Sequence, residues 1–195
     1  MNSFINYLNL QKIQFDKFDL IVFYGCSGSG KSTQIQQLLK TQYPLEQVTT
    51  ISAAPIPWKK LLHDKNSLNS FIYIDEIQQH RELSYLRLLL AKQHKLFVAS
   101  HVKPAWFFYL RTQYKTCIIN LDQHSSKIAM RLEQLKLTFS QTAITHYIQS
   151  YGASFTEIDI ILERHPDTNF DQALSRFQKL NSITLSPRSR PLRID

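Results

Sequence analysis

Short apolar runs alternate with amphipathic stretches along the N-terminal part of the chain. Consecutive apolar residues are typical of strands that are buried on both faces of a parallel sheet, and helical periodicity separates one run from the next. Because strands that alternate with helices of about ten residues form right-handed crossovers, the pattern predicts a parallel sheet. The predicted strands are 20–24, 48–52, 71–75, 96–100 and 117–121, and the predicted helices between them are 32–41, 58–63, 81–92 and 104–111.

The pattern changes after residue 121, where only helical periodicity continues. Further helices are predicted at 126–136, 141–151, 155–164 and 170–180. Gly152 occupies a helix C-cap position, and Ser154 or Thr156 can cap the helix that follows. The chain is therefore expected to divide into an α/β domain over residues 1–123, a helical unit over 124–182 and a basic flexible tail over 183–195.

Glycine is concentrated at one place in the sequence. The chain has four glycines, whereas average usage of about 7% would give roughly fourteen in a chain of this length. Gly25, Gly28 and Gly30 fall within six residues, directly after the first predicted strand. The backbone there is expected to approach a ligand closely, since glycine leaves the most room for such an approach.

Residues 25–32 read G-C-S-G-S-G-K-S, a complete match to the phosphate-loop pattern G-x-x-x-x-G-K-[ST] between a strand and a helix. Backbone N–H groups and the helix N-terminus of such a loop bind phosphate oxygens. Lys31 then reaches the β- and γ-phosphates, and Ser32 offers its hydroxyl to Mg²⁺. We expect a P-loop NTPase fold with three αβα layers and a five-stranded parallel sheet. The residues expected to bind ATP are Gly25, Cys26, Ser27, Gly28, Ser29, Gly30, Lys31, Ser32 and Thr33.

Two carboxylates close the third predicted strand, in the string Y-I-D-E. The carboxyl ends of parallel strands meet at one edge of the sheet, so Asp75 and Glu76 are expected beside the phosphate loop. Asp75 would hold Mg²⁺, and Glu76 would orient or deprotonate the water that attacks the γ-phosphate. Nucleoside and small-molecule kinases usually lack a catalytic glutamate after the magnesium aspartate. The acid pair therefore favours ATP hydrolysis.

Charge and cysteine usage narrow the class of protein further. The formal net charge is +8 and the isoelectric point about 9.5, a balance that attracts polyanions such as nucleic acid. Two widely separated cysteines, Cys26 and Cys117, do not indicate a disulfide scaffold or a zinc site, and they fit a reducing compartment. No apolar stretch reaches the roughly 18 residues that span a bilayer, and no signal-peptide pattern opens the chain. A cytoplasmic protein is expected.

The sequence resembles the AAA+ ATPases, and within them the DnaA-type replication initiators and the IstB-type helicase-loader ATPases. The resemblance covers roughly residues 15–180. It implies that the final helices form an AAA+ lid and that ATP binding drives homo-oligomerisation or docking onto a protein partner. The segments that carry it are G-C-S-G-S-G-K-S (25–32), I-D-E-I-Q (74–78), L-F-V-A-S-H (96–101) and the helical unit.

The resemblance also implies roles for single residues. Ser100 falls at the sensor-1 position, on a strand between the phosphate-loop strand and the acidic strand, and His101 could substitute for it. Arg111 lies near the place of an arginine finger, which would reach the γ-phosphate of a neighbouring subunit. The sensor-2 arginine would fall at 154–158, where the chain has none, and Arg164 comes a turn or two late.

Three hypotheses about function remain open. The first is an AAA+-type ATPase that acts in a DNA transaction or loads a partner. The second is a phosphotransferase that acts on a nucleoside or another small hydroxyl substrate, and the third is an adaptor that binds ATP without hydrolysing it. The aromatic cluster W-F-F-Y at 106–109 is expected to be a packed helix face, with a docking surface as the alternative.

Overall fold

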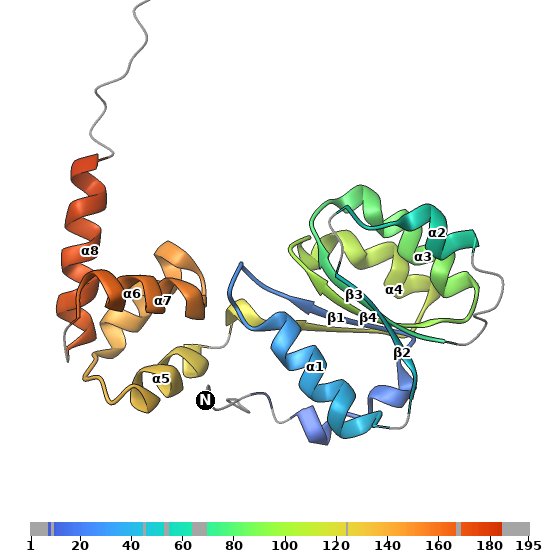
Figure 1. Ribbon diagram of the computed structural model, residues 1–195, viewed down its shortest axis with the longest axis horizontal. Helices are drawn as coiled ribbons and strands as arrows, with labels where there is room; N and C mark the ends of the chain where they lie inside the picture. The colour runs from blue at the N-terminus through green and yellow to red at the C-terminus, as the bar shows by residue number, and fades with distance from the viewer. Residues whose placement is uncertain are drawn as a thin grey trace, which may run out of the picture.

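The computed structural model describes residues 8, 10–44, 46–52, 55–63, 70–123, 125–166 and 169–184. Five strands form one sheet in the order β2-β3-β4-β1-β5, and every neighbouring pair is parallel (Figure 1). This confirms the predicted parallel sheet, with β4 between the strand that precedes the glycines and the strand that carries the acids. The strands are β1 (Leu20–Tyr24), β2 (Val48–Ile51), β3 (Phe71–Ile77), β4 (Lys95–Ser100) and β5 (Thr116–Asn120).

The helices begin and end close to the predicted residues. One difference is that the segment predicted as a helix over 104–111 begins with a 3₁₀ turn, η4 (Pro104–Phe107). The α-helices are α1 (Lys31–Gln42), α2 (Trp58–His63), α3 (Leu83–Ala91), α4 (Phe108–Gln113), α5 (Ser125–Gln134), α6 (Gln141–Tyr151), α7 (Phe155–Arg164) and α8 (Phe170–Thr184). The further 3₁₀ turns are η1 (Leu10–Lys12), η2 (Phe15–Lys17), η3 (His80–Glu82) and η5 (Leu121–Gln123).

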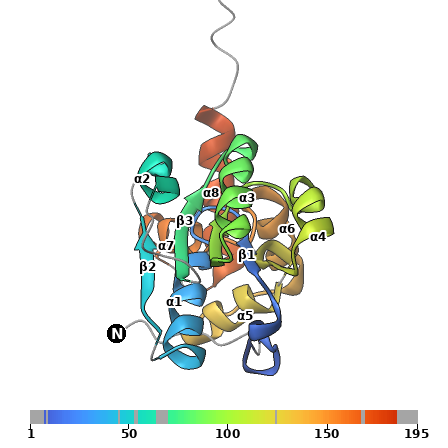
Figure 2. The ribbon, with the colours of Figure 1, turned by 90° about the vertical axis from the view of Figure 1, so that its right-hand side faces the viewer.

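Helices cover both faces of the sheet, so β1 is apolar along most of its length. Leu20 and Val22 face a core that includes side chains of α3 and α4, whereas Ile21 and Phe23 face the core that α1 closes. Figures 1 and 2 show α2, α3 and α4 on one side of the sheet and α1 on the other. The loop that joins β1 to α1 lies at the edge of the sheet where β1 ends.

The helices α5–α8 form a module with an apolar core of their own. Ser140 and Ser154 cap α6 and α7, because each side chain accepts a hydrogen bond from the backbone N–H three residues on. Gly152 is the C-cap of α6, as predicted, and has a φ of 68°, which glycine adopts without strain. The core side chains include Ile128, Leu132, Ile144, Tyr147, Ile158, Ile161, Phe170 and Leu174. Residue 124 and most of the predicted tail, 185–195, lie outside the described residues.

Strand β3 runs two residues beyond its predicted end at Asp75. Its pairing with β4 shifts register between Ile74 and Ile77, and Glu76 within this irregularity has a φ of 71°. A non-glycine residue rarely adopts that conformation, and such strain is common at functional sites. Along the described part of the chain, no helix combines the length and the apolar character that crossing a membrane requires.

Candidate functional site

The glycine loop, residues 25–32, connects the carboxyl end of β1 to the first turn of α1. Gly28 and Gly30 have φ values of 69° and 89°, in the left-handed region that glycine adopts without strain. A Cβ atom on Gly28 would lie 2.3 Å from Oγ1 of Thr156, so a larger residue there would displace the start of α7. The concentration of glycine in the sequence is explained by these two requirements, unusual backbone angles and close packing.

Lys31 lies over the loop with its ammonium group directed at backbone oxygens. Its Nζ donates hydrogen bonds to the carbonyl oxygens of Gly25, at 2.9 Å, and of Cys26, at 2.7 Å. The side chain is buried, and this burial lowers the pKa of Lys31. The first residues of α1, Lys31, Ser32 and Thr33, line the cleft. A buried cation beside a helix N-terminus favours an anion there.

Ser32 and Asp75 meet at the same edge of the sheet although 43 positions separate them. The Oγ of Ser32 donates a hydrogen bond to Oδ1 of Asp75, over 2.8 Å. Ser32 and Asp75 offer hard oxygen ligands, the kind that Mg²⁺ takes when waters and phosphate oxygens complete its shell. No cluster of three or more His, Cys, Asp and Glu side chains that could hold a metal occurs in the described ranges.

Glu76 and His101 face each other across the same edge. Nε2 of His101 lies 3.7 Å from Oε1 of Glu76, whose side chain is 54% exposed. Burial, reinforced by the charge of Lys31, lowers the pKa of His101, so the imidazole is neutral at neutral pH and the contact is no ion pair. Glu76 is therefore a solvent-accessible carboxylate beside the cleft.

These groups line one cleft of about 390 Å³. It runs from the glycine loop across the acidic end of β3 to the start of α7, so the two halves of the chain both contribute to it. Its lining residues are Ser27, Gly28, Ser29, Gly30, Lys31, Ser32, Thr33, Asp75, Glu76, His101, Phe155 and Thr156. Most of the residues expected to bind ATP are therefore brought together.

The helical module is joined to the glycine loop by direct contacts. The backbone N–H of Phe155 donates to the carbonyl of Gly28 at 2.9 Å, and Nζ of Lys127 donates to the carbonyl of Ser29 at 2.9 Å. Lys127 is fully buried and lies 5.1 Å from the centre of the Phe155 ring. Burial lowers the pKa of Lys127 to about 8, so the ammonium group next to the loop loses its proton more easily than an ordinary lysine does.

Asp122, in η5 after β5, binds the first turn of the loop. Both of its carboxylate oxygens accept from the backbone N–H of Cys26, at 3.0 and 3.1 Å. Burial, with a further contribution from the Asp122 charge, raises the pKa of the Cys26 thiol to about 11. Cys26 is consequently a protonated thiol whose amide is already engaged.

The structure leaves some of the expected site residues outside this cleft. Ser100 is fully buried, and its hydroxyl accepts a hydrogen bond from the N–H of Val102. His101, the residue after β4, lines the cleft and Ser100 does not. Arg111 is exposed on α4 and does not line the cleft. An arginine finger acts on the nucleotide of a neighbouring subunit, so it does not have to line the cleft of its own chain. Gly25 and Cys26 shape the loop without lining the cleft.

The sequence reasoning missed Asp122, Lys127 and Phe155 as site residues. A signal for Asp122 was present, because it follows an apolar strand in the same way as Asp75 does and must reach the same edge of the sheet. No comparable signal marks Lys127 or Phe155, whose roles arise when the module packs on the loop. No protein-family model matches this chain, and no curated protein matches it.

Proposed function

We propose that the chain is an AAA+-like ATPase that binds ATP with Mg²⁺ and hydrolyses it to ADP and phosphate. The observation that carries the proposal is that Lys31, Ser32 and Asp75 lie together in one cleft at the edge of the sheet. Two glycines with left-handed backbone conformation, Gly28 and Gly30, line the same cleft. Strands remote in sequence contribute to it, so the phosphate-loop pattern coincides with a spatial site.

Each residue has a defined task in this proposal. The N–H groups of the glycine loop and the start of α1 bind phosphate oxygens, and Lys31 leaves the carbonyls of Gly25 and Cys26 to contact the β- and γ-phosphates. Glu76 orients and deprotonates the attacking water, a task for which an exposed carboxylate at the cleft edge is suited. Mg²⁺, held by Ser32 and Asp75, would neutralise charge on the phosphate oxygens.

The proposed cellular role is a DNA-related process or the loading of a partner protein, with α5–α8 acting as the lid. The net charge of +8 supports a polyanionic partner. The contacts of Lys127 and Phe155 with the glycine loop support a lid that responds to nucleotide, because phosphate binding in the loop would alter the groups to which these residues bond. Arg111, exposed on α4, is available to a second subunit.

A second candidate is an adaptor that binds ATP without hydrolysing it. One observation favours it: α7 contributes Phe155 and Thr156 to the cleft, where the resemblance implies an arginine. A phenyl ring cannot compensate charge on the γ-phosphate. In this case ATP would raise the melting temperature while no phosphate is released.

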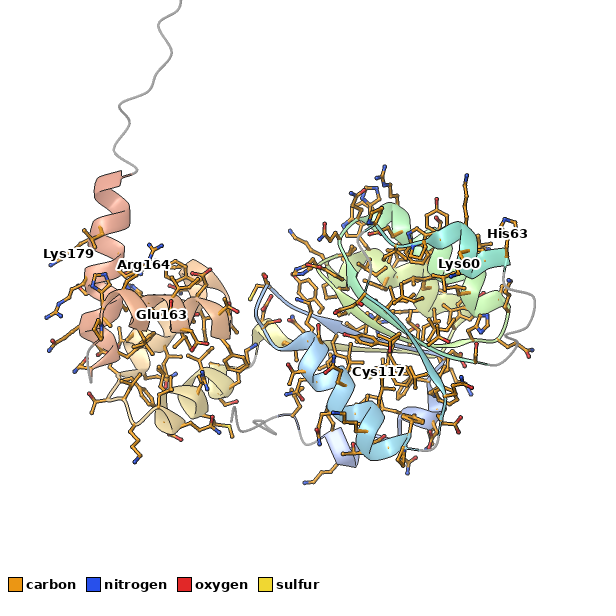
Figure 3. The ribbon with its side chains drawn as sticks, in the orientation of Figure 1. Lys60, His63, Cys117, Glu163, Arg164 and Lys179 are labelled. Carbon is orange, nitrogen blue, oxygen red and sulfur yellow. The ribbon has the colours of Figure 1, made fainter. Side chains whose placement is uncertain are left out.

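Phosphate release by Glu76→Gln tests the proposal. The variant should bind ATP with unchanged affinity and release phosphate slower by a factor on the order of 100 or more. Glu163→Gln, on α7 and outside the cleft (Figure 3), is the matched control that should behave as wild type. Equal turnover by the two variants would remove Glu76 from the mechanism, and no turnover by wild type, with nucleotide bound, would favour the adaptor.

A further inference from the structure

On the side of the sheet covered by α2, α3 and α4, several aromatic rings are exposed to solvent and are not packed in the core. Side chains of Trp106 and Phe108 are 52% and 67% exposed, and only Phe107 between them is fully buried. The expectation of a packed helix face for this cluster is therefore wrong for Trp106 and Phe108. Tyr85 on α3 is a third exposed ring, at 37%.

Tyr85 and Trp106 each belong to a stacked pair, whereas Phe108 meets the ring of Tyr109 edge-on. We call the surface formed by these rings and the cations around them the strip. Trp58 of α2 stacks on Tyr85 at a centroid distance of 4.9 Å, and Trp106 stacks on His80 at 4.8 Å. Arg81, which follows His80 in the chain, lines a second cleft of about 340 Å³ together with Trp58 and Tyr85. This cleft shares Asp75 and Glu76 with the first, so the strip ends beside the proposed catalytic carboxylate.

Basic residues outnumber acids on this side of the sheet. Over residues 55–63, 78–92 and 101–113 the chain has seven lysines and arginines and one acid, Glu82. Two further acids, Asp75 and Glu76, lie where the strip ends in the second cleft. Six of the seven are exposed, and among the residues that the structure describes none of these six forms an ion pair. Figure 3 shows Lys60 on α2, on the side of the sheet opposite α1. The exposed basic residues are Lys59, Lys60, Arg81, Arg87, Lys103 and Arg111.

We infer that this basic aromatic strip binds single-stranded nucleic acid, with bases stacked on Trp106, Phe108 and the Trp58–Tyr85 pair and phosphates neutralised by the surrounding cations. Exposed rings interleaved with cations form the surface that holds a single strand without sequence readout. A duplex is a poorer match, since its bases are already stacked and paired. The inference specifies the DNA-related role proposed above but does not depend on nucleotide binding at the glycine loop.

Both tryptophans of the chain, Trp58 and Trp106, lie in the strip, so tryptophan fluorescence reports binding there directly. Titration with oligo-dT of about 20 nucleotides should quench this fluorescence to saturation in nucleotide-free protein, and the matching duplex should bind more weakly. The Trp106→Ala/Phe108→Ala variant should lose about tenfold or more in affinity, measured by anisotropy of a labelled oligonucleotide. Both side chains are largely exposed, and a thermal melt checks that the variant folds.

Charge variants separate this strip from the general basicity of the chain. Lys59→Ala/Lys60→Ala should reduce the slope of log affinity against log salt by about 1.4, because each lost phosphate contact on a single strand is worth about 0.7. Lys17→Ala/Lys40→Ala removes the same charge from the α1 side of the sheet and should leave the slope unchanged.

Three results would overturn the inference: binding without tryptophan quenching, tighter binding of the duplex, or dimerisation through the strip in the absence of nucleic acid. Lys31→Ala should still bind oligo-dT. If wild type fails to bind ATP while oligo-dT still quenches its tryptophan fluorescence, the proposed ATPase is refuted and the inference about the strip stands.

Discussion

Replacing Lys127 with methionine tests how the helical module is docked on the glycine loop. The ammonium group is fully buried, bonds the carbonyl of Ser29, and has Cys26, Asp122 and Lys31 as its charged or titratable neighbours. Burial lowers its pKa from the ordinary 10.5 to about 8. This difference corresponds to about 3 kcal/mol, because a tenfold change in proton affinity is worth about 1.4 kcal/mol.

The sign of the effect follows from proton linkage. The unfolded chain holds the proton of Lys127 more tightly than the folded chain does, so the free energy of unfolding rises as the pH rises from about 8 towards 10.5. Between about pH 7 and about pH 9.5 this residue should contribute about 2 kcal/mol of that rise. Methionine has no proton to lose, and the contribution should be missing from the Lys127→Met variant.

Urea denaturation gives the free energy of unfolding of wild type and of Lys127→Met at the two pH values. The rise with pH in wild type minus the rise in the variant is the contribution of Lys127. Other groups that titrate in this range, such as the Cys26 thiol, are common to both proteins and largely cancel. Lys40→Met, on an exposed part of α1, is the control that should follow wild type. An identical pH dependence in wild type and Lys127→Met would show that the ammonium is not buried against the loop.

Three further substitutions test the site and the module. Ser32→Ala should abolish most of the Mg²⁺ dependence of nucleotide affinity while affinity without Mg²⁺ stays the same; a retained Mg²⁺ effect in calorimetry would exclude the Ser32–Asp75 pair as ligands. Gly28→Ala should cost about 1–2 kcal/mol from its φ alone and more from the clash with Thr156, seen as a lower midpoint of urea denaturation. Ser154→Ala removes the cap of α7 and should cost about 1 kcal/mol; an unchanged thermal midpoint would contradict that cap.

Local patterns were sufficient to predict the sheet and the core of the site. The run L-I-V-F-Y over 20–24 is apolar because helices cover both faces of β1, and this pattern was enough to predict the strand. The meeting of Ser32 and Asp75 could be expected because parallel strands end at one edge of the sheet. Such features depend on residues that are close in sequence or on topology alone.

Contacts that arise from tertiary packing could not be read from the sequence. The positive φ of Glu76 lies within a register shift between β3 and β4, and no residue pattern in 71–77 predicts that shift. Lys127 looks like a surface lysine of an amphipathic helix until α5 packs against the loop. Of the consecutive rings 106–108 only Phe107 is buried in the core, because successive residues of a helix point about 100° apart and which of them faces the core is decided by packing.

Calorimetric titration of ATP and Mg²⁺ into wild type and Lys31→Ala tests the central claim most directly. The claim is that the ammonium and the backbone N–H groups at the start of α1 hold the phosphates. Wild type should bind one nucleotide per chain, and the variant should lose roughly a hundredfold in affinity because a charge-assisted contact to phosphate is gone. Lys40→Ala, on the exposed side of the same helix, should bind as wild type does. Equal affinities for Lys31→Ala and wild type would contradict the claim.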